Sequence, residues 1–210
     1  SPMDRRPKFH LYQPNIALIS GIAWDHINVF PTYENYVEQF EIFIKLITNG
    51  GILVYNEEDS EVKRVAEAAS NPIRKLPYST PSYRVENGVT LLKTPEGDMP
   101  IEVFGAHNLN NLAGAKWICQ NMGIDEADFY EAIASFKGAS KRLEKIAEST
   151  TKVAYKDFAH SPSKVAATTK AVKEQYPRRT LIACLELHTY SSLNAEFLKE
   201  YQGALEHADV

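Results

Sequence analysis

Apolar runs of strand length alternate with amphipathic stretches of helix length in the first third of the chain. Residues 16–22 and 52–55 are almost wholly apolar, which is typical of strands buried on both faces of a parallel sheet. Residues 32–47 repeat apolar side chains at helical spacing, with Thr32 placed as an N-cap, and a second helix is expected over 57–70. The first helix would bury one apolar stripe: Tyr36, Val37, Phe40, Ile44 and Ile47. This β-α-β-α order favours a doubly wound α/β sheet.

The pattern changes after residue 71, where period-two alternation replaces helical spacing. Residues 83–86 and 89–92 flank Asn87-Gly88, a dipeptide that supplies the positive φ angles of a type I′ turn. We therefore expect an antiparallel hairpin after the parallel part of the fold.

A helix is predicted over residues 108–122, after a short apolar strand at 101–104, and a further helix over 125–136. Two interpretations of Asn108 and Asn111 are open. In one, Asn108 caps the helix and Asn111 is solvated; in the other, both amides bind a ligand at the helix start, where α/β proteins hold phosphates and bases. The predicted apolar face of this helix consists of Leu112, Ala115, Cys119 and Met122.

A second β-α-β-α run follows the small, polar stretch at residues 137–140. A strand is predicted at 153–155, a helix begins at Ser161-Pro162, and a strand at 180–185 precedes a last helix at 195–205. We place a domain boundary between residues 139 and 140, which gives domains of residues 1–139 and 140–210.

Composition narrows the class of protein. The chain has 210 residues, 44% of them hydrophobic, and a formal net charge of −4. That charge argues against nucleic acid or an anionic membrane as the main partner. No apolar run reaches the length of a membrane-spanning helix, so we expect no membrane insertion and a cytoplasmic location. Cys119 and Cys184 are expected to be buried, reduced thiols.

Polar side chains gather directly after the predicted strands and at the domain boundary. In an open α/β sheet, ligands bind beyond the carboxyl ends of the strands, so we expect these groups to line a cleft between two domains. Asn amides suit a base, carboxylates suit ribose hydroxyls, Arg suits phosphate and His suits a metal. Each group also has a plain structural role as a cap, turn or surface residue. The groups are Asp25-His26, His107-Asn108 with Asn111, Lys141-Arg142 with Glu144, Asp157 with His160, and residues 188–191.

Four segments, in this order, resemble the motifs of the Mur ligases, which are ATP-dependent amide-bond ligases of peptidoglycan assembly and recycling. Asp25-His26 resembles a "DH" motif, and residues 105–111 resemble "G-x-H-N-x-x-N". Residues 136–144 are similar to "F-x-G-x-x-R-R-x-E", and residues 155–162 are similar to "D-D-Y-A-H-H-P".

The resemblance implies an α/β fold in two parts: a partial central domain, with a parallel sheet, helices and an antiparallel patch, and then a partial Rossmann-like C-terminal domain. The family's UDP-sugar domain and its glycine-rich phosphate loop ending in Gly-Lys-Thr/Ser do not occur in these residues. We therefore expect these 210 residues alone to be catalytically inactive.

The resemblance also implies the cofactors ATP and Mg²⁺. It assigns roles to residues of all four motifs. His26 would ligate Mg²⁺. Asn108 and Asn111 would hold adenine or its neighbourhood, with His107 nearby, and Asp157 would bind ribose hydroxyls.

Catalysis and recognition of the amine would fall to later residues. Arg142 would contact the phosphate or ribose of the nucleotide, and His160 would face the reacting groups. The loop of His188, Tyr190 and Ser191 would recognise the incoming amine.

Two positions depart from the family pattern. Lys141 stands where the family often has Arg, which puts a bidentate phosphate contact in doubt but keeps the charge. Ser161 stands where a second His is common, so the role of that His is lost. No lysine is a clear candidate for the modified lysine with which some members hold a second metal.

The implied reaction activates the lactyl carboxylate of UDP-N-acetylmuramate as an acyl phosphate, which a peptide amine then attacks. Residues 157–160 and 186–188 favour the tripeptide L-Ala-γ-D-Glu-meso-diaminopimelate as the amine, in peptidoglycan recycling. L-Alanine, in de novo synthesis, is the nearest alternative. Two other readings are a folylpolyglutamate synthetase of the same superfamily and a non-catalytic nucleotide-binding module.

Overall fold

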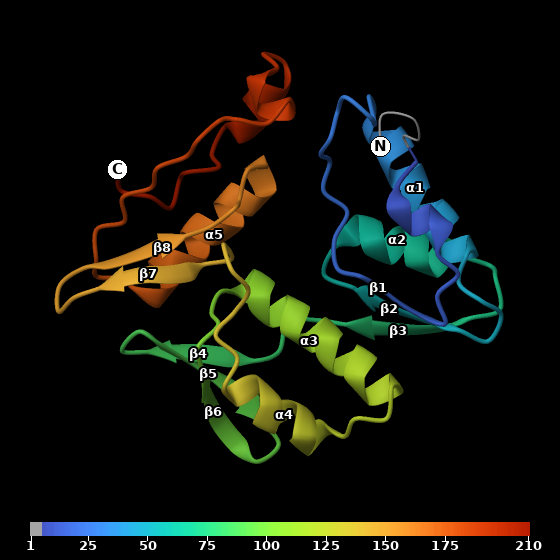
Figure 1. Ribbon diagram of the computed structural model, residues 1–210, viewed down its shortest axis with the longest axis horizontal. Coiled ribbons are helices and arrows are strands. Elements are labelled where there is room, and N and C mark those ends of the chain that lie inside the picture. The colour runs from blue at the N-terminus through green and yellow to red at the C-terminus, as the bar shows by residue number, and fades with distance from the viewer. Residues whose placement is uncertain (1–5) are drawn as a thin grey trace. The chain divides into compact units, whose positions relative to one another are not determined.

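The computed structural model describes residues 6–210, which fall into two compact units (Figure 1). Of the residues described, the first unit comprises 6–80 and Asn110–Phe129, and the second comprises Pro81–Leu109 and Tyr130–Val210. The boundary predicted between residues 139 and 140 stays a prediction.

The first unit is built on a parallel sheet of three strands in the order β1-β2-β3. β1 (Ile16–Ile19) pairs with β2 (Ile52–Asn56), which pairs with β3 (Arg74–Tyr78). β1 is shorter than predicted, and β3 was not predicted because its sequence, Arg-Lys-Leu-Pro-Tyr, lacks an apolar run. Its position at the end of this strand order accommodates the proline, which has no N–H to donate.

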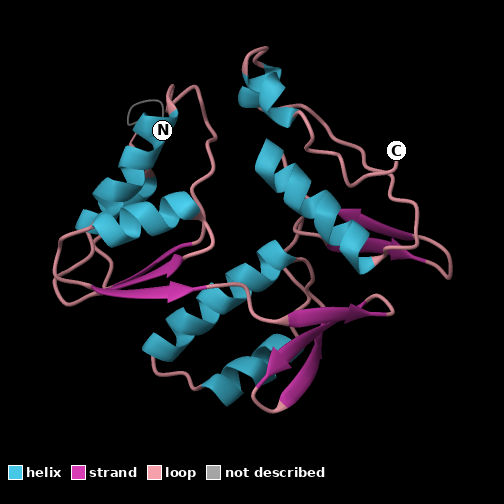
Figure 2. Cartoon of the chain, turned by 180° about the vertical axis from the view of Figure 1, so that it is seen from behind, coloured by secondary structure: helices cyan, strands magenta, loops and turns pink. Residues whose placement is uncertain are grey.

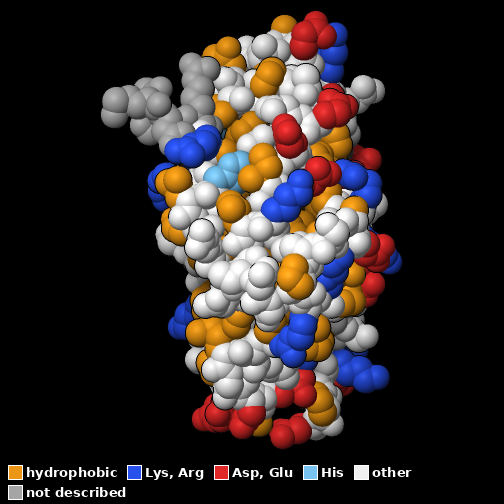
Figure 3. Space-filling model, turned by 90° about the vertical axis from the view of Figure 1, so that its right-hand side faces the viewer, with side chains coloured by type: hydrophobic (Ala, Val, Ile, Leu, Met, Phe, Trp, Pro, Cys, Tyr) orange, Lys and Arg blue, Asp and Glu red, His pale blue; other side chains and the backbone are white. Residues whose placement is uncertain are grey.

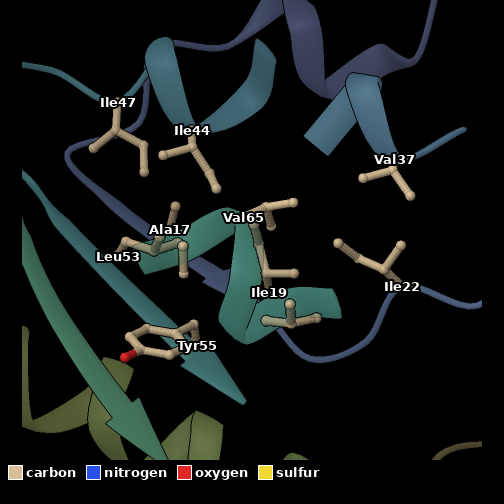
Figure 4. Close-up of a cluster of buried hydrophobic side chains, with 11 residues drawn as sticks. Ala17, Ile19, Ile22, Val37, Ile44, Ile47, Leu53, Tyr55 and Val65 are labelled. Atoms are coloured by element: carbon tan, nitrogen blue, oxygen red, sulfur yellow. The ribbon is translucent and has the colours of Figure 1, made fainter. Parts of the chain in front are cut away.

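Two helices cover the core of this unit as predicted. α1 (Tyr33–Lys45) is capped by the Thr32 hydroxyl, which accepts a hydrogen bond from the Asn35 N–H at 3.1 Å. α2 (Ser60–Ala68) is capped by the Asp59 carboxylate, which accepts from two N–H groups of the first turn. The predicted stripe of α1 packs against β1, β2 and α2, so that prediction is confirmed; Figure 4 shows Val37, Ile44 and Ile47 directed toward Ala17, Ile19, Leu53 and Val65.

The part of α3 (Ala106–Asn121) that belongs to the first unit forms a second cluster with β2 and β3. The predicted apolar face of this helix is only partly right, because Leu112 is buried and Cys119 is partly buried, whereas Ala115 is exposed and Met122 is 67% exposed. The buried cluster instead contains Ala113, with Trp117 and Ile118 packed against it. Gly114 explains the rotation: a Cβ there would lie 3.0 Å from Tyr78, so the helix approaches the strands on this side.

The second unit begins with an antiparallel sheet in the order β4-β5-β6. β4 (Tyr83–Glu86) and β5 (Val89–Thr94) form the predicted hairpin, with φ of 51° at Asn87 and 79° at Gly88. β6 spans Gly97–Ile101, so the strand predicted at 101–104 is wrong. The register pairs Ile101 with Thr90 near the start of β5, and the ladder therefore ends there.

β7 (Glu144–Glu148) and β8 (Val153–Lys156) form a second antiparallel pair in this unit, followed by α5 (Pro162–Gln175). Ser161 occupies the N-cap position of α5, and proline is at its start, as predicted. The helix end is tied to the hairpin, since the buried Thr90 hydroxyl donates to the Gln175 side-chain oxygen at 3.0 Å. The helix predicted at 125–136 is observed as α4 (Glu126–Ala134).

The last thirty residues differ from the prediction (Figure 2). Residues 180–185 form no strand; instead Leu181 and Ala183 exchange backbone hydrogen bonds with Asp209 and Val210. The predicted helix at 195–205 is the short 3₁₀ helix η3 (Phe197–Tyr201), preceded by η2 (Ser191–Leu193); a third such helix, η1, spans Lys8–Leu11. A strand needs a continuous ladder partner, which this segment has only at two residues.

The remaining features are the charges on the surface, the length of the helices and the state of the two cysteines. Lys and Arg side chains are interspersed with Asp and Glu on the face drawn in Figure 3, without a continuous basic patch. Across residues 6–210, no helix combines the length and the apolar character needed to cross a bilayer. Both cysteines are free, but Cys184 is exposed and Cys119 is only partly buried, so the prediction of two buried thiols is wrong.

Gly51 gives a test of the packing at the start of β2. A Cβ at this residue would lie 2.8 Å from the backbone oxygens of Asn15 and Thr48, which cannot move aside cheaply. We expect Gly51→Ala to lower the free energy of unfolding by about 2 kcal/mol. Urea unfolding measures it.

The matched control is Gly21→Ala, whose Cβ would meet its nearest neighbour, the Asp59 carboxylate, at an ordinary 3.5 Å. We expect that change to stay within about 0.5 kcal/mol of the parent protein. Equal unfolding midpoints for the two variants would contradict the packing at Gly51.

Candidate functional site

The start of α3 is held against α5 by a glycine. Gly105 has φ of 87°, and a Cβ there would lie 2.4 Å from the Ala171 side chain, so only glycine fits. The helix begins at Ala106, and the Asn108 side chain donates to the Phe104 carbonyl at 2.9 Å. Asn108 is therefore a residue of the first turn and not the N-cap, which corrects the capping interpretation.

His107 lies in the same turn and is largely shielded from solvent. Burial lowers the pKa of the His107 imidazole, and the negative charge of Asp157 only partly opposes this. The imidazole is therefore neutral at pH 7, and one ring nitrogen is a hydrogen-bond acceptor.

The pH dependence of stability tests this state of His107. Its pKa is lower in the folded protein than the ordinary 6.5, so the unfolded chain binds the proton first as the pH falls. As the pH is lowered from about 6.5, we expect the free energy of unfolding to decrease until the pH has passed the folded-state pKa of His107. His107→Gln should remove this part of the pH dependence. Thermal unfolding at a series of pH values measures the slope, and an imidazole NMR titration at or above 6.5 would contradict the assignment.

The Asp157 carboxylate holds the loop that carries Arg142. It accepts hydrogen bonds from the Leu143 N–H at 2.7 Å and from the Ala159 N–H at 2.6 Å. Lys141 and Leu143, on either side of Arg142, both have left-handed φ angles, 57° and 48°. Such angles are strained for these residue types and persist only where surrounding bonds impose them. Asp157 therefore determines the backbone around Arg142.

Glu144 fixes the other side of the same loop. Its carboxylate accepts from the Lys141 N–H at 2.7 Å and from the Ser140 hydroxyl at 3.1 Å. The hydrogen bond from the Lys141 backbone N–H, and next that from the Ser140 hydroxyl, lower the pKa of Glu144. The Phe158 N–H also donates to the Lys141 carbonyl at 2.9 Å, so the segments 140–144 and 157–159 are tied together.

Arg142, His160 and His188 gather around the Phe158 ring, which sequence reasoning did not single out. Phe158 is 45% exposed, and the Arg142 guanidinium lies 5.9 Å from its ring centroid. The His160 and His188 rings lie 4.9 Å and 6.0 Å from it, and 6.5 Å from each other. We call these four residues the Phe158 cluster. An aromatic residue just beyond a predicted strand, inside a motif of polar residues, was the available signal.

The cluster has a definite chemical character. An exposed aromatic face suits a base or sugar, the guanidinium suits phosphate, and imidazoles transfer protons near neutral pH. The Nδ1 atoms of His160 and His188 lie 2.8 Å and 3.2 Å from the carbonyls of Phe158 and Glu186. Because a carbonyl only accepts, Nδ1 carries the proton in these bonds and Nε2 is the basic nitrogen of each neutral ring.

The other predicted amine-binding residues lie at the start of η2. Tyr190 is 66% exposed, whereas Ser191 is buried. Their roles in binding stay predictions.

His26 is exposed, in a loop that follows β1. Its φ is 57°, and its N–H donates to the buried Asp25 carboxylate at 2.7 Å. The loop is anchored by the Ile22 N–H, which donates to the Asp59 carboxylate at 3.0 Å. Within residues 6–210, no three His, Cys, Asp or Glu side chains come together as a metal site. The residues described do not by themselves fit a Mg²⁺ ion, and the predicted role of His26 as a ligand stays a prediction.

Two neighbouring asparagines of α3 differ in their exposure to solvent. Asn111, a predicted ligand-binding residue, is exposed, while Asn110, which was not singled out, is 7% exposed. Asn110 shares helical spacing with Ala113, Gly114 and Trp117. A search for a polar residue at helical spacing from small or aromatic residues would have found it.

Comparison with known proteins now bears on this arrangement. The family model of the Mur ligase middle domain matches residues 4–119, more than half of the chain. The chain belongs to the Mur ligase family. A UDP-N-acetylmuramate–L-alanine ligase of Lactococcus lactis subsp. cremoris is 28% identical over 96% of this chain and 47% of its own length. The chain thus spans about half the length of the curated relatives it matches.

Solved structures of Mur ligases share the fold. The UDP-N-acetylmuramate–alanine ligase MurC from Thermotoga maritima aligns with a TM-score of 0.69 and 18% identity, over 98% of this chain and 47% of that one. A murein peptide ligase from Psychrobacter arcticus aligns with a TM-score of 0.61 and 19% identity, over 99% and 45% of the two chains. The α/β fold class, with a parallel sheet and antiparallel additions, is confirmed.

Proposed function

We propose that the protein is an ATP-dependent ligase that joins the carboxylate of UDP-N-acetylmuramate to an amine. The observation that carries the proposal is the Phe158 cluster, with Arg142 and two histidines held beside Asp157, in a member of the Mur ligase family. A bound ATP would supply the phosphoryl group that activates the carboxylate.

Within this proposal Arg142 binds the phosphate or ribose of the nucleotide, and its positive charge offsets the negative charge of the phosphate. Its exposed guanidinium lies on a loop whose backbone is held by the hydrogen bond from the Leu143 N–H to the Asp157 carboxylate, so the base of the side chain is fixed before a ligand binds. Asp157 keeps unused acceptor capacity on both oxygens, which suits ribose hydroxyls. The neutral His107, with Asn108 and Asn111, is proposed to contact the adenine region.

His160 and His188 are proposed to face the reacting groups. Because Nδ1 of each ring donates to a carbonyl, Nε2 is the nitrogen that we propose accepts the proton that the attacking amine must lose. Tyr190 and Ser191 belong to the same segment as His188 and are proposed to help recognise the amine. His26 is proposed to contribute one ligand to Mg²⁺.

L-Alanine is the amine that the named relatives favour, since curated relatives from several bacteria carry the name UDP-N-acetylmuramate–L-alanine ligase. The tripeptide L-Ala-γ-D-Glu-meso-diaminopimelate is the second candidate, favoured by the sequence of residues 157–160 and 186–188. A cytoplasmic location, in peptidoglycan synthesis or recycling, stays part of the proposal.

Phosphate release from ATP tests the function directly. The full-length protein is given UDP-N-acetylmuramate with L-alanine in one reaction and with the tripeptide in another. We expect release that needs both the UDP-sugar and one amine, and the productive amine identifies the pathway. Release with neither amine, while ATP still binds, would favour the non-catalytic nucleotide-binding module.

Arg142 gives a residue-level test. We expect Arg142→Gln to raise the KM for ATP roughly 10- to 100-fold, because a charge-assisted hydrogen bond to the nucleotide is lost. Arg142→Lys should fall between, since it keeps the charge but loses the planar fork.

Lys145→Gln is the matched control. Lys145 is an exposed cation close to Arg142 in sequence, and it forms an ion pair with Glu148 on its own strand, β7. We expect its KM for ATP to equal that of the parent protein. An equal rise in both variants would show that the effect is one of general surface charge and not of Arg142.

A further inference from the structure

A polar network around the buried side chains of Asn110 and Asn56 joins α3 to the carboxyl ends of the strands in the first unit. The Asn110 side-chain amide lies 3.1 Å from the Asn56 side-chain oxygen, 3.1 Å from the Glu58 carboxylate and 3.2 Å from the Thr80 hydroxyl. Asn56 ends β2, and Thr80 lies just beyond the end of β3. The amide therefore reaches the ends of two neighbouring strands.

The partners of Asn110 are themselves bonded to one another. The Glu58 carboxylate accepts from the Thr80 N–H at 3.1 Å and from the Thr80 hydroxyl at 2.6 Å. Asn56 donates to the Ser20 carbonyl at 3.0 Å, just beyond β1, and accepts from the Glu58 N–H at 3.0 Å. The network thus fixes the positions that follow all three strands, where α/β sheets bind ligands.

Apolar packing alone does not require this arrangement. On the same side of α3, Ala113 is buried in the second cluster and Gly114 allows close approach to Tyr78. Such small contacts tolerate rotation of the helix about its axis, whereas directional hydrogen bonds from an amide do not. Burying an amide costs free energy unless it is hydrogen-bonded, whereas a leucine of similar size needs no partner. Packing alone therefore does not require an asparagine at this position.

The next residue along the helix is Asn111, which is exposed. Consecutive side chains on an α-helix are separated by about 100° around the axis. Fixing Asn110 against the strand ends therefore fixes the direction in which Asn111 points.

We propose that Asn110, with Glu58 and Thr80, is a positioning residue that directs Asn111 toward the nucleotide. The inference rests on the proposed function, in which Asn111 contacts the adenine region. Asn110 acts through Asn111 and does not itself touch the nucleotide.

A double-mutant cycle on the full-length protein tests this, with the dissociation constant for ATP as the readout. We expect Asn110→Leu and Asn111→Ala each to weaken ATP binding about tenfold. The double variant should also bind about tenfold more weakly and not a hundredfold, because Asn110 has nothing to direct once Asn111 is truncated. A merely structural role for Asn110 would give losses that multiply.

Two further variants test whether the loss of ATP binding arises from the hydrogen-bond network of Asn110. Thr80→Val keeps the side-chain shape and removes the hydroxyl that bonds to Asn110 and Glu58, so it tests the network even if Asn110→Leu fails to fold. We expect about threefold weaker ATP binding, and no further loss when Asn111→Ala is already present. Asn121→Leu, the same substitution at the far end of α3, should leave ATP binding unchanged.

The outcomes separate the inference from the proposed function. A hundredfold loss in the double variant, or Asn110→Leu and Thr80→Val binding ATP normally while Asn111→Ala does not, overturns the inference alone. A parent protein that does not bind ATP, or an Asn111→Ala variant that binds it normally, overturns the nucleotide-binding role of Asn111 and the inference with it.

Discussion

The Asp157 carboxylate is the group on which the candidate site in the second unit depends. It accepts the N–H groups of Leu143 and Ala159, and so joins the loop before β7 to the loop after β8. Two residues of the first loop are left-handed, a conformation that the chain would not adopt without such bonds. Arg142 stands between them. The hydrogen bonds of the partly buried Asp157 carboxylate therefore fix the backbone from which the exposed Arg142 side chain extends.

The first unit uses carboxylates and amides in the same way. Asp59 caps α2 and also accepts the Ile22 N–H in the loop that leads to His26. Glu58 and Asn110 join the ends of β2 and β3. In both units, carboxylate and amide side chains determine where the loops beyond the strands lie. Ligand-binding loops on α/β sheets need this support, because their own backbone has no ladder partners.

The chain belongs to the Mur ligase family and shares the fold of its solved members, and the roles of the site residues stay proposals. The family match covers residues 4–119, and the curated relatives are about twice as long as this chain. The activity is accordingly a proposal for the full-length protein. The residues described here supply an aromatic platform, a guanidinium and imidazoles, whereas a complete metal site is not formed by residues 6–210.

Local sequence determined the elements whose signals are local: β1 and β2 from apolar runs, α1 from its stripe and Thr32 cap, the hairpin from Asn87-Gly88, and the order of four motifs. Tertiary structure decided the rest. β3 and β7 exist because a neighbouring strand offers a ladder, and residues 180–185 are irregular because only two of them have partners. The rotation of α3, which buries Asn110 and exposes Asn111, depends on Gly114 meeting Tyr78 far away in sequence. Pairing and close approach are properties of two segments at once, and no single stretch of sequence contains them.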